Sequence, residues 1–140
     1  MKIDVIISSP LKRAKDSAMM ISKFHPQTPI KFVNELKEMN FGDFQGKCLK
    51  KLGIKREDTF WLSAENNGES IYHIYTRAKR FLKNIKKAYP KKKILIIGHA
   101  TINRALVCAI KKFPTDKSLK IIANPNYIVH GTYTLANMDY

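Results

Sequence analysis

Hydrophobic positions divide this chain into short continuous runs and longer periodic stretches. The run IDVIISS near the N-terminus and the run KILIIGHA around residues 94–97 are short, apolar and rich in β-branched residues. A third run, IKFV from residue 30, has the same character. Such runs are typical of strands. Because they lack a polar alternation, they favour a sheet that is covered on both faces.

The stretches between these runs show the three-to-four-residue spacing of amphipathic helices. One follows Ser9-Pro10, which we interpret as an N-cap and first helical position, and should end before the prolines of HPQTP. A second has Ser70 as its N-cap and stops at Pro90. A third covers TINRALVCAI, with Thr101 as its cap. The apolar face of the second helix comprises Ile71, Tyr75, Ala78, Leu82 and Ile85.

The remaining stretches have weaker patterns. The segment ELKEMNFGDFQGK contains two glycines and little periodicity, so it predicts an ordered loop. Residues 50–63 predict a partial helix, and the tail predicts strands around 119–123 and 127–135. The alternation of strand and helix predicts one α/β domain over residues 1–140, with a mostly parallel sheet.

Composition excludes several classes of protein. Hydrophobic residues make up 44% of the chain, enough for a packed core. No apolar run has the length of a membrane span, and the N-terminus lacks a secretory signal pattern, so we expect no membrane partner. Cys48 and Cys108 have no metal-ligand spacing, which favours free thiols in a reducing cytoplasm and predicts no metal site.

The net charge of +15 predicts attraction to anions. Between Arg77 and Lys93 there are nine Lys or Arg and no acidic residue. Phosphorylated metabolites, nucleic acid and anionic surfaces all fit this charge. No helix-turn-helix, zinc-finger or RNA-recognition signature is present. We therefore interpret most of the lysines as solvated surface, with weak nonspecific binding of polyanions.

Candidate chemical groups follow two of the predicted strands. In parallel sheets, ligands bind beyond the carboxyl ends of the strands, where helix N-termini suit anions. The first strand leads into Ser9 and Arg13, and the strand at 94–97 ends at His99. Arg13 could grip a phosphate and His99 could donate a hydrogen bond or exchange a proton. Glu38, in the loop, could protonate a leaving group. Each residue type also occurs commonly in a purely structural role.

Four segments together resemble the histidine phosphatase superfamily, in its phosphoglycerate-mutase-like branch. DVIISSPLKRAKDSA is similar to the pattern S-P-x-x-R-A-x-x-T-A, with Ser17 where threonine is usual. ELKEMNFGDFQGK is similar to L-x-E-x-x-F-G-x-x-x-G, and NGESIYHIYTRAKRFL to a G-E-S segment with an arginine-bearing helix. ILIIGHATINRALV is similar to the strand that carries the second catalytic histidine. The segments follow the family's order from Asp4 to about Val107.

The resemblance implies a three-layer α/β/α sandwich and phosphoryl transfer through a phosphohistidine, without metal or cofactor. The partner would be a small phosphorylated metabolite or inorganic phosphate. Roles carried over from the family make His99 the second active-site histidine and Glu38 the proton donor. The substrate side would comprise Arg13 and Ser9 at the phosphate, with Glu69 and Ser70 shaping the pocket around it. Arg77 is a weaker match with a structural role.

One departure from the family concerns the nucleophile. The family begins with a strand ending in R-H-G, whose histidine is phosphorylated, and no such strand precedes Asp4. A misassigned start or truncated gene, a member that has lost catalysis, or a substitute nucleophile would each explain this. The one substitute is VHGTYT, with His130, which is most simply a strand histidine.

We therefore expect an N-terminally truncated domain that binds anions but turns over little or no substrate by itself. Loss of a central strand would leave an open edge beside residues 94–97, so the chain should form homo-oligomers through that edge, rearrange its C-terminal strands or aggregate. The alternatives are a non-catalytic anion-binding or regulatory module on the same scaffold, and, last, a basic nucleic-acid-binding protein.

Overall fold

The structure, a computed structural model, describes residues 2–55 and 67–127 and is built on a parallel sheet. The strands are β1 (Val5–Ser8), β2 (Ile30–Phe32) and β3 (Ile94–Ile97), in the order β2-β1-β3. Ile7 of β1 lies opposite Lys31 of β2 and Ile96 of β3. The predicted parallel sheet is thus confirmed, with the first strand at its centre.

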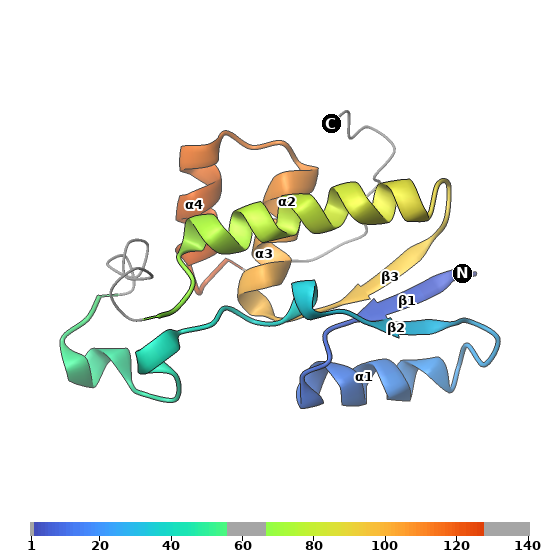
Figure 1. The fold of residues 1–140 in the computed structure, drawn as a ribbon, viewed down its shortest axis with the longest axis horizontal. Helices are drawn as coiled ribbons and strands as arrows, with labels where there is room; N and C mark the ends of the chain where they lie inside the picture. Colours follow the sequence, from blue (N-terminus) through green and yellow to red (C-terminus); the bar gives the residue numbers. More distant parts are fainter. Residues whose placement is uncertain (1, 56–66, 128–140) are drawn as a thin grey trace.

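Helices cover both faces of this sheet (Figure 1). One face carries α1 (Lys12–Ser22). The other carries α2 (Ile71–Ala88), α3 (Ala100–Ile110) and α4 (Thr115–Ala123). This is the three-layer α/β/α arrangement that the resemblance implied. No helix among residues 2–55 and 67–127 is long and apolar enough to cross a membrane.

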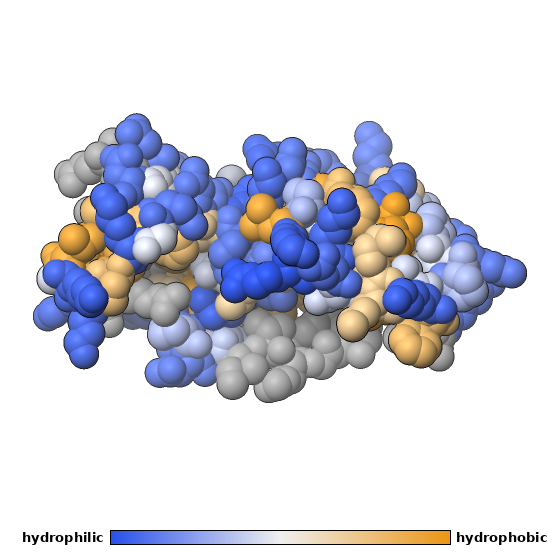
Figure 2. All heavy atoms as spheres, turned by 90° about the horizontal axis from the view of Figure 1, so that it is seen from below, coloured by the Kyte–Doolittle hydropathy of each residue, from blue (hydrophilic) through white to orange (hydrophobic). Residues whose placement is uncertain are grey.

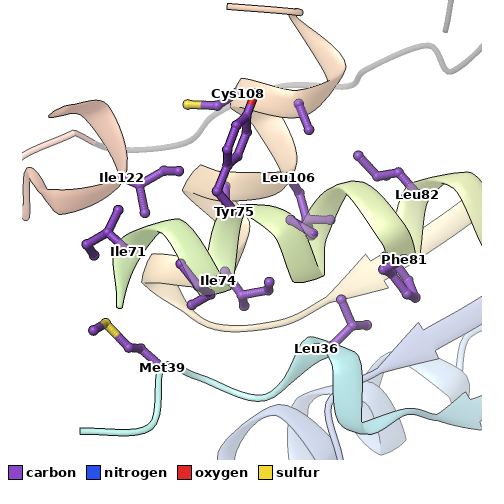
Figure 3. Packing of buried hydrophobic residues seen from close by; sticks show 14 of the residues in the cluster. Leu36, Met39, Ile71, Ile74, Tyr75, Phe81, Leu82, Leu106, Cys108 and Ile122 are labelled. Carbon is purple, nitrogen blue, oxygen red and sulfur yellow. The ribbon is translucent and has the colours of Figure 1, made fainter. Parts of the chain in front are cut away.

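The main core lies between the sheet and the layer of three helices (Figure 3). Val5 and Ile7 of β1 belong to it, whereas Ile6, between them, points to the face that α1 covers. All five residues predicted for the apolar face of α2 are buried. Leu36 and Met39 pack against the same core from the loop that follows β2.

The helix starts differ from the prediction at two of three positions. Ser70 caps α2 as predicted, because its side chain accepts a hydrogen bond from the His73 backbone N–H. In contrast, α1 begins at Lys12 rather than Pro10, since Ser9 Oγ accepts from the Leu11 N–H in a turn before the helix. The N-cap of α3 is His99, so Thr101 lies inside the helix.

The strand predicted around residues 119–123 is wrong, because this stretch belongs to α4. Ser118, Ile122 and Ala123 are buried at helical spacing on one side of α4, so the run of apolar residues is a helix face. The tail strand at 127–135 lies outside the described residues from 128 onward. The predicted ordered loop holds two short 3₁₀ turns, Asn34–Leu36 and Gly42–Phe44. The partial helix predicted for 50–63 is described only up to 55, where the 3₁₀ turn Leu49–Leu52 lies.

Two apolar surfaces are left uncovered by the described part of the chain. All four residues of β3 are partly exposed, although they are as apolar as the fully buried β1, and no described strand pairs with the far edge of β3. On the α1 side, shown in Figure 2, hydrophobic side chains interrupt a largely hydrophilic surface. The exposed apolar residues of α1 and the turn after it are Met19, Met20 and Phe24.

Candidate functional site

The carboxyl ends of β1 and β3 bring Ser9 and His99 together. The Ser9 backbone N–H donates to the Ile97 carbonyl at 2.9 Å, which continues the β1–β3 pairing past both strands. The side chains then meet, with Ser9 Oγ 2.9 Å from His99 Nε2. Both residues are buried. The two strand ends singled out in the sequence therefore form one site.

Arg13 stands at this site as a charge open to solvent. It is the second residue of α1, and its side chain is exposed. It makes no ion pair with another described residue. The charge nevertheless reaches His99, because it acts to lower the pKa of that imidazole. An exposed guanidinium beside a buried histidine is suited to hold an anion between them.

The protonation of His99 is governed by three neighbouring influences. Burial is the largest and lowers the pKa of His99 below its ordinary value. The Glu38 carboxylate acts in the opposite direction, and Arg13 adds to the lowering. The net shift is downward, so His99 is neutral at pH 7 and can donate only one ring N–H.

Glu38 approaches His99 from the loop after β2. Its Oε2 accepts a hydrogen bond from the Thr101 backbone N–H at 3.2 Å, and its Oε1 accepts from the Met39 N–H at 2.9 Å. The Thr101 amide is one of the unpaired N–H groups of the first turn of α3, where a negative charge is favourable. The carboxylate thus sits at the start of the helix that His99 caps.

Glu69 and Ser70, predicted on the substrate side, have partners within the protein. The Glu69 carboxylate pairs with Arg77, at 2.9 Å from Nε and 2.8 Å from Nη2. The Ser70 hydroxyl caps α2. A direct role of these two side chains in substrate binding stays a prediction.

The site therefore gathers Ser9, Arg13, Glu38 and His99. The contacts of Glu69 and Ser70 are instead with Asn40, Arg77 and the first turn of α2. Sequence analysis missed the Thr101 amide as the partner of Glu38, since a backbone group carries no residue-specific signal. Within the described ranges, no group of three His, Cys, Asp or Glu side chains could hold a metal ion. The site thus combines an exposed cation at the start of α1, Arg13, with a neutral imidazole and a carboxylate at the start of α3, His99 and Glu38. Together these groups are suited to bind a phosphate and to exchange a proton with it.

The chain is similar to known proteins over most of its length. A sequence profile of the histidine phosphatase superfamily (branch 1) matches residues 1–134. The uncharacterized phosphatase PhoE of Bacillus subtilis is 33% identical over 107 residues, which cover 76% of this chain and 53% of that protein. Phosphoserine phosphatase 1 of Hydrogenobacter thermophilus is 29% identical over 115 residues, covering 77% of this chain and 54% of that protein.

Solved structures agree with this assignment. Bacillus stearothermophilus YhfR matches with a TM-score of 0.72 and 25% identity, over 84% of this chain and 61% of that one. The phosphoglycerate mutase of Bacillus anthracis matches with a TM-score of 0.66 and 20% identity, over 80% of this chain and 61% of that one, and shows a shared fold. The chain spans about half the length of the curated relatives it matches.

Proposed function

The chain belongs to the histidine phosphatase superfamily, and from this membership we propose that it binds the phosphate group of a small phosphorylated metabolite between Arg13 and His99. The observation that carries the proposal is the meeting of the two strand ends at Ser9 and His99, 2.9 Å apart, with the charges of Arg13 and Glu38 acting on the same imidazole. Phosphoryl transfer through a phosphohistidine is the chemistry that we propose for the complete protein.

Each side chain has a distinct part in this proposal. Arg13 forms charge-assisted hydrogen bonds to the phosphate oxygens. Neutral His99 donates its N–H to the phosphoryl group. Glu38 is the group that passes a proton to the leaving oxygen, while phosphorus forms a bond to the nucleophilic histidine and its bond to that oxygen breaks. In the second half of the reaction, water attacks phosphorus and gives a proton to the Glu38 carboxylate, while the bond from phosphorus to the histidine nitrogen breaks and phosphate leaves.

The nucleophile is the part of this chemistry that the described residues do not supply. Ser9 Oγ engages Nε2 of His99, and we assign His99 to binding the phosphoryl group rather than to attack on phosphorus. We propose that a strand ending in R-H-G pairs with the open edge of β3, and that the 140-residue chain by itself binds anions without turnover. His130, the alternative nucleophile, lies outside the described residues.

The relatives guide the choice of substrate. The two curated relatives named above, from Bacillus subtilis and Hydrogenobacter thermophilus, are called phosphatases, and the second is a phosphoserine phosphatase, which supports hydrolysis of a small phosphomonoester. Phosphoserine is therefore the first substrate to test, beside a generic aryl phosphate. A cytoplasmic location stays a prediction that rests on Cys48 and Cys108.

Calorimetric titration with phosphate, vanadate or tungstate tests the binding site. Arg13→Ala should weaken binding by about 1.5–3 kcal/mol, the range for hydrogen bonds to charged groups. His99→Ala should also weaken it. Arg80→Ala, which removes an exposed arginine from α2, is the matched control and should leave affinity unchanged. Unchanged affinity in both Arg13→Ala and His99→Ala would show that the anion site is elsewhere.

A further inference from the structure

The guanidinium of Arg77, on α2, holds the backbone that leads into Glu38. Its Nη1 donates to the Glu35 carbonyl at 2.6 Å and to the Lys37 carbonyl at 2.9 Å. Its Nε and Nη2 pair with the Glu69 carboxylate. One arginine thereby binds two carbonyls within the three residues that precede Glu38. The same arginine binds the carboxylate of Glu69, which lies more than thirty residues after Glu38 in the chain.

Glu69 holds the same loop just after Glu38. Its Oε2 accepts from the Asn40 backbone N–H at 3.0 Å, and its own N–H donates to the Asn40 carbonyl at 2.7 Å. Gly68 makes this approach close, because a Cβ there would lie 2.8 Å from the Asn40 oxygen. The backbone is therefore fixed on both sides of Glu38 by one ion pair.

Apolar packing completes the support from a third direction. Leu36 is fully buried and Met39 is 5% exposed, and both point into the core beneath α2 (Figure 3). The Glu38 carboxylate lies between these anchored positions and bonds to the amides of Met39 and Thr101.

The Arg77–Glu69 ion pair is largely withdrawn from water. The Arg77 and Glu69 side chains are only 13% and 24% exposed, so pairing them required removal of both from water. Ion pairs with that desolvation cost add little stability compared with apolar packing, which Leu36 and Met39 already supply. What the pair adds is direction, since the planar guanidinium binds the Glu69 carboxylate through Nε and Nη2 and holds both carbonyls through Nη1.

We propose that Arg77 and Glu69 are positioning residues for Glu38, holding its carboxylate at the start of α3 beside His99. The proton-donor role of Glu38 rests on the proposed function, but the placement of its carboxylate does not. The placement can be measured without turnover through the imidazole of His99, which senses the charges of Glu38 and Arg13.

The experiment is an NMR titration of the imidazole nitrogens in the full chain, with His99 assigned through His99→Gln. Glu38→Gln defines the reference: it should lower the pKa of His99, because the carboxylate raises it. Arg77→Met should also lower the pKa of His99, by more than half of the fall that Glu38→Gln causes. In the Glu38→Gln background, Arg77→Met should add nothing. Arg77→Lys keeps the positive charge but loses the planar guanidinium, so its His99 pKa should lie between the values of the wild type and of Arg77→Met.

Two further variants keep the test decisive. Arg80→Met makes the same substitution at an exposed arginine of α2 and should leave the pKa of His99 unchanged. Glu69→Gln weakens the pair from its other side and should act like Arg77→Met; it carries the test if Arg77→Met does not fold. A folded Arg77→Met or Glu69→Gln protein with the wild-type pKa at His99 overturns the proposal, and so does an unshifted Glu38→Gln protein. Anion affinity that is unchanged in both Arg13→Ala and His99→Ala would instead reject the proposed function and leave this result standing.

Discussion

Ser9 Oγ and His99 Nε2, from residues 90 positions apart in the chain, lie 2.9 Å apart and join the ends of two adjacent parallel strands. Ser9 is fully buried, and its hydroxyl also accepts from the Leu11 N–H at 3.2 Å. One hydroxyl thus fixes the orientation of the imidazole and the turn into α1, which carries Arg13.

Ser9→Ala should therefore destabilise the fold. Loss of the hydroxyl leaves buried polar groups without a partner, so the free energy of unfolding should fall by about 1–3 kcal/mol. Ser17→Ala removes an exposed hydroxyl from α1 and should change the free energy of unfolding by less than about 0.5 kcal/mol. Urea unfolding followed by circular dichroism measures both. Equal effects of the two variants would contradict the importance of the Ser9–His99 contact.

The charge of Arg13 should be visible in the titration of His99. Burial and Arg13 both lower the pKa of that imidazole, so it should titrate below the ordinary histidine value of roughly 6.5. Arg13→Met should raise the pKa towards that value. The imidazole NMR titration used for Glu38→Gln gives the measurement, with Arg80→Met as control. A fall or no change in Arg13→Met would place the guanidinium away from His99.

The same shift predicts how stability depends on pH. The folded chain resists protonation of His99, whereas the unfolded chain protonates it near its ordinary pKa of roughly 6.5. The contribution of neutral His99 to stability is therefore complete above this pH and is lost as the pH falls through the lower folded-state value. Unfolding experiments between pH 7 and pH 5 should show a shallower loss for His99→Gln than for the wild type. Parallel profiles would show that His99 is not linked to folding.

The uncovered edge of β3 should govern association of the chain. Residues Ile94–Ile97 are partly exposed and pair with β1 along one edge, while no described strand pairs with their other edge. An apolar strand edge favours association. Light scattering after size exclusion should show oligomers or aggregates that grow with concentration. A form extended by a segment ending in R-H-G should be a monodisperse phosphatase, and its nucleophile His→Ala variant should be inactive.

One result for the 140-residue chain would contradict this prediction. A stable monomer whose metal-independent phosphatase turnover survives both His99→Ala and His130→Ala would contradict the requirement for an added strand.

The basic face of α2 should be dispensable for the site. Replacing Lys83, Lys86 and Lys87 with glutamine should leave the circular dichroism spectrum and the phosphate affinity unchanged, because Lys83 and Lys87 are exposed and none of the three belongs to the buried residues of α2. Binding to duplex DNA should be weak and should decline steeply with added salt. A mobility shift at two salt concentrations measures this. Salt-resistant, sequence-specific binding would show that the basic helix has a recognition role.

Local pattern alone determined much of this protein. The apolar runs at β1, β2 and β3 predicted the strands, and the spacing of α2 predicted its buried face, because both periodicities arise from backbone geometry within one element. Ser70 was predicted as a cap because its acceptor role involves a donor only three residues away. Where two local readings competed, pattern was insufficient: the apolar run around Ile122 fits either a strand or a helix face, and packing against α3 decided for the helix.

The geometry of the site was decided only by tertiary structure. The residue types of Arg13, Glu38 and His99 carry a family resemblance, but their proximity requires the carboxyl ends of β1 and β3 to meet at the same edge of the sheet. The anchoring of Glu38 was invisible in the sequence because its partners are backbone groups: the Thr101 amide, and the two carbonyls that Arg77 binds from 40 and 42 residues away. Every residue has such groups, so only the packing of distant segments selects which of them are used.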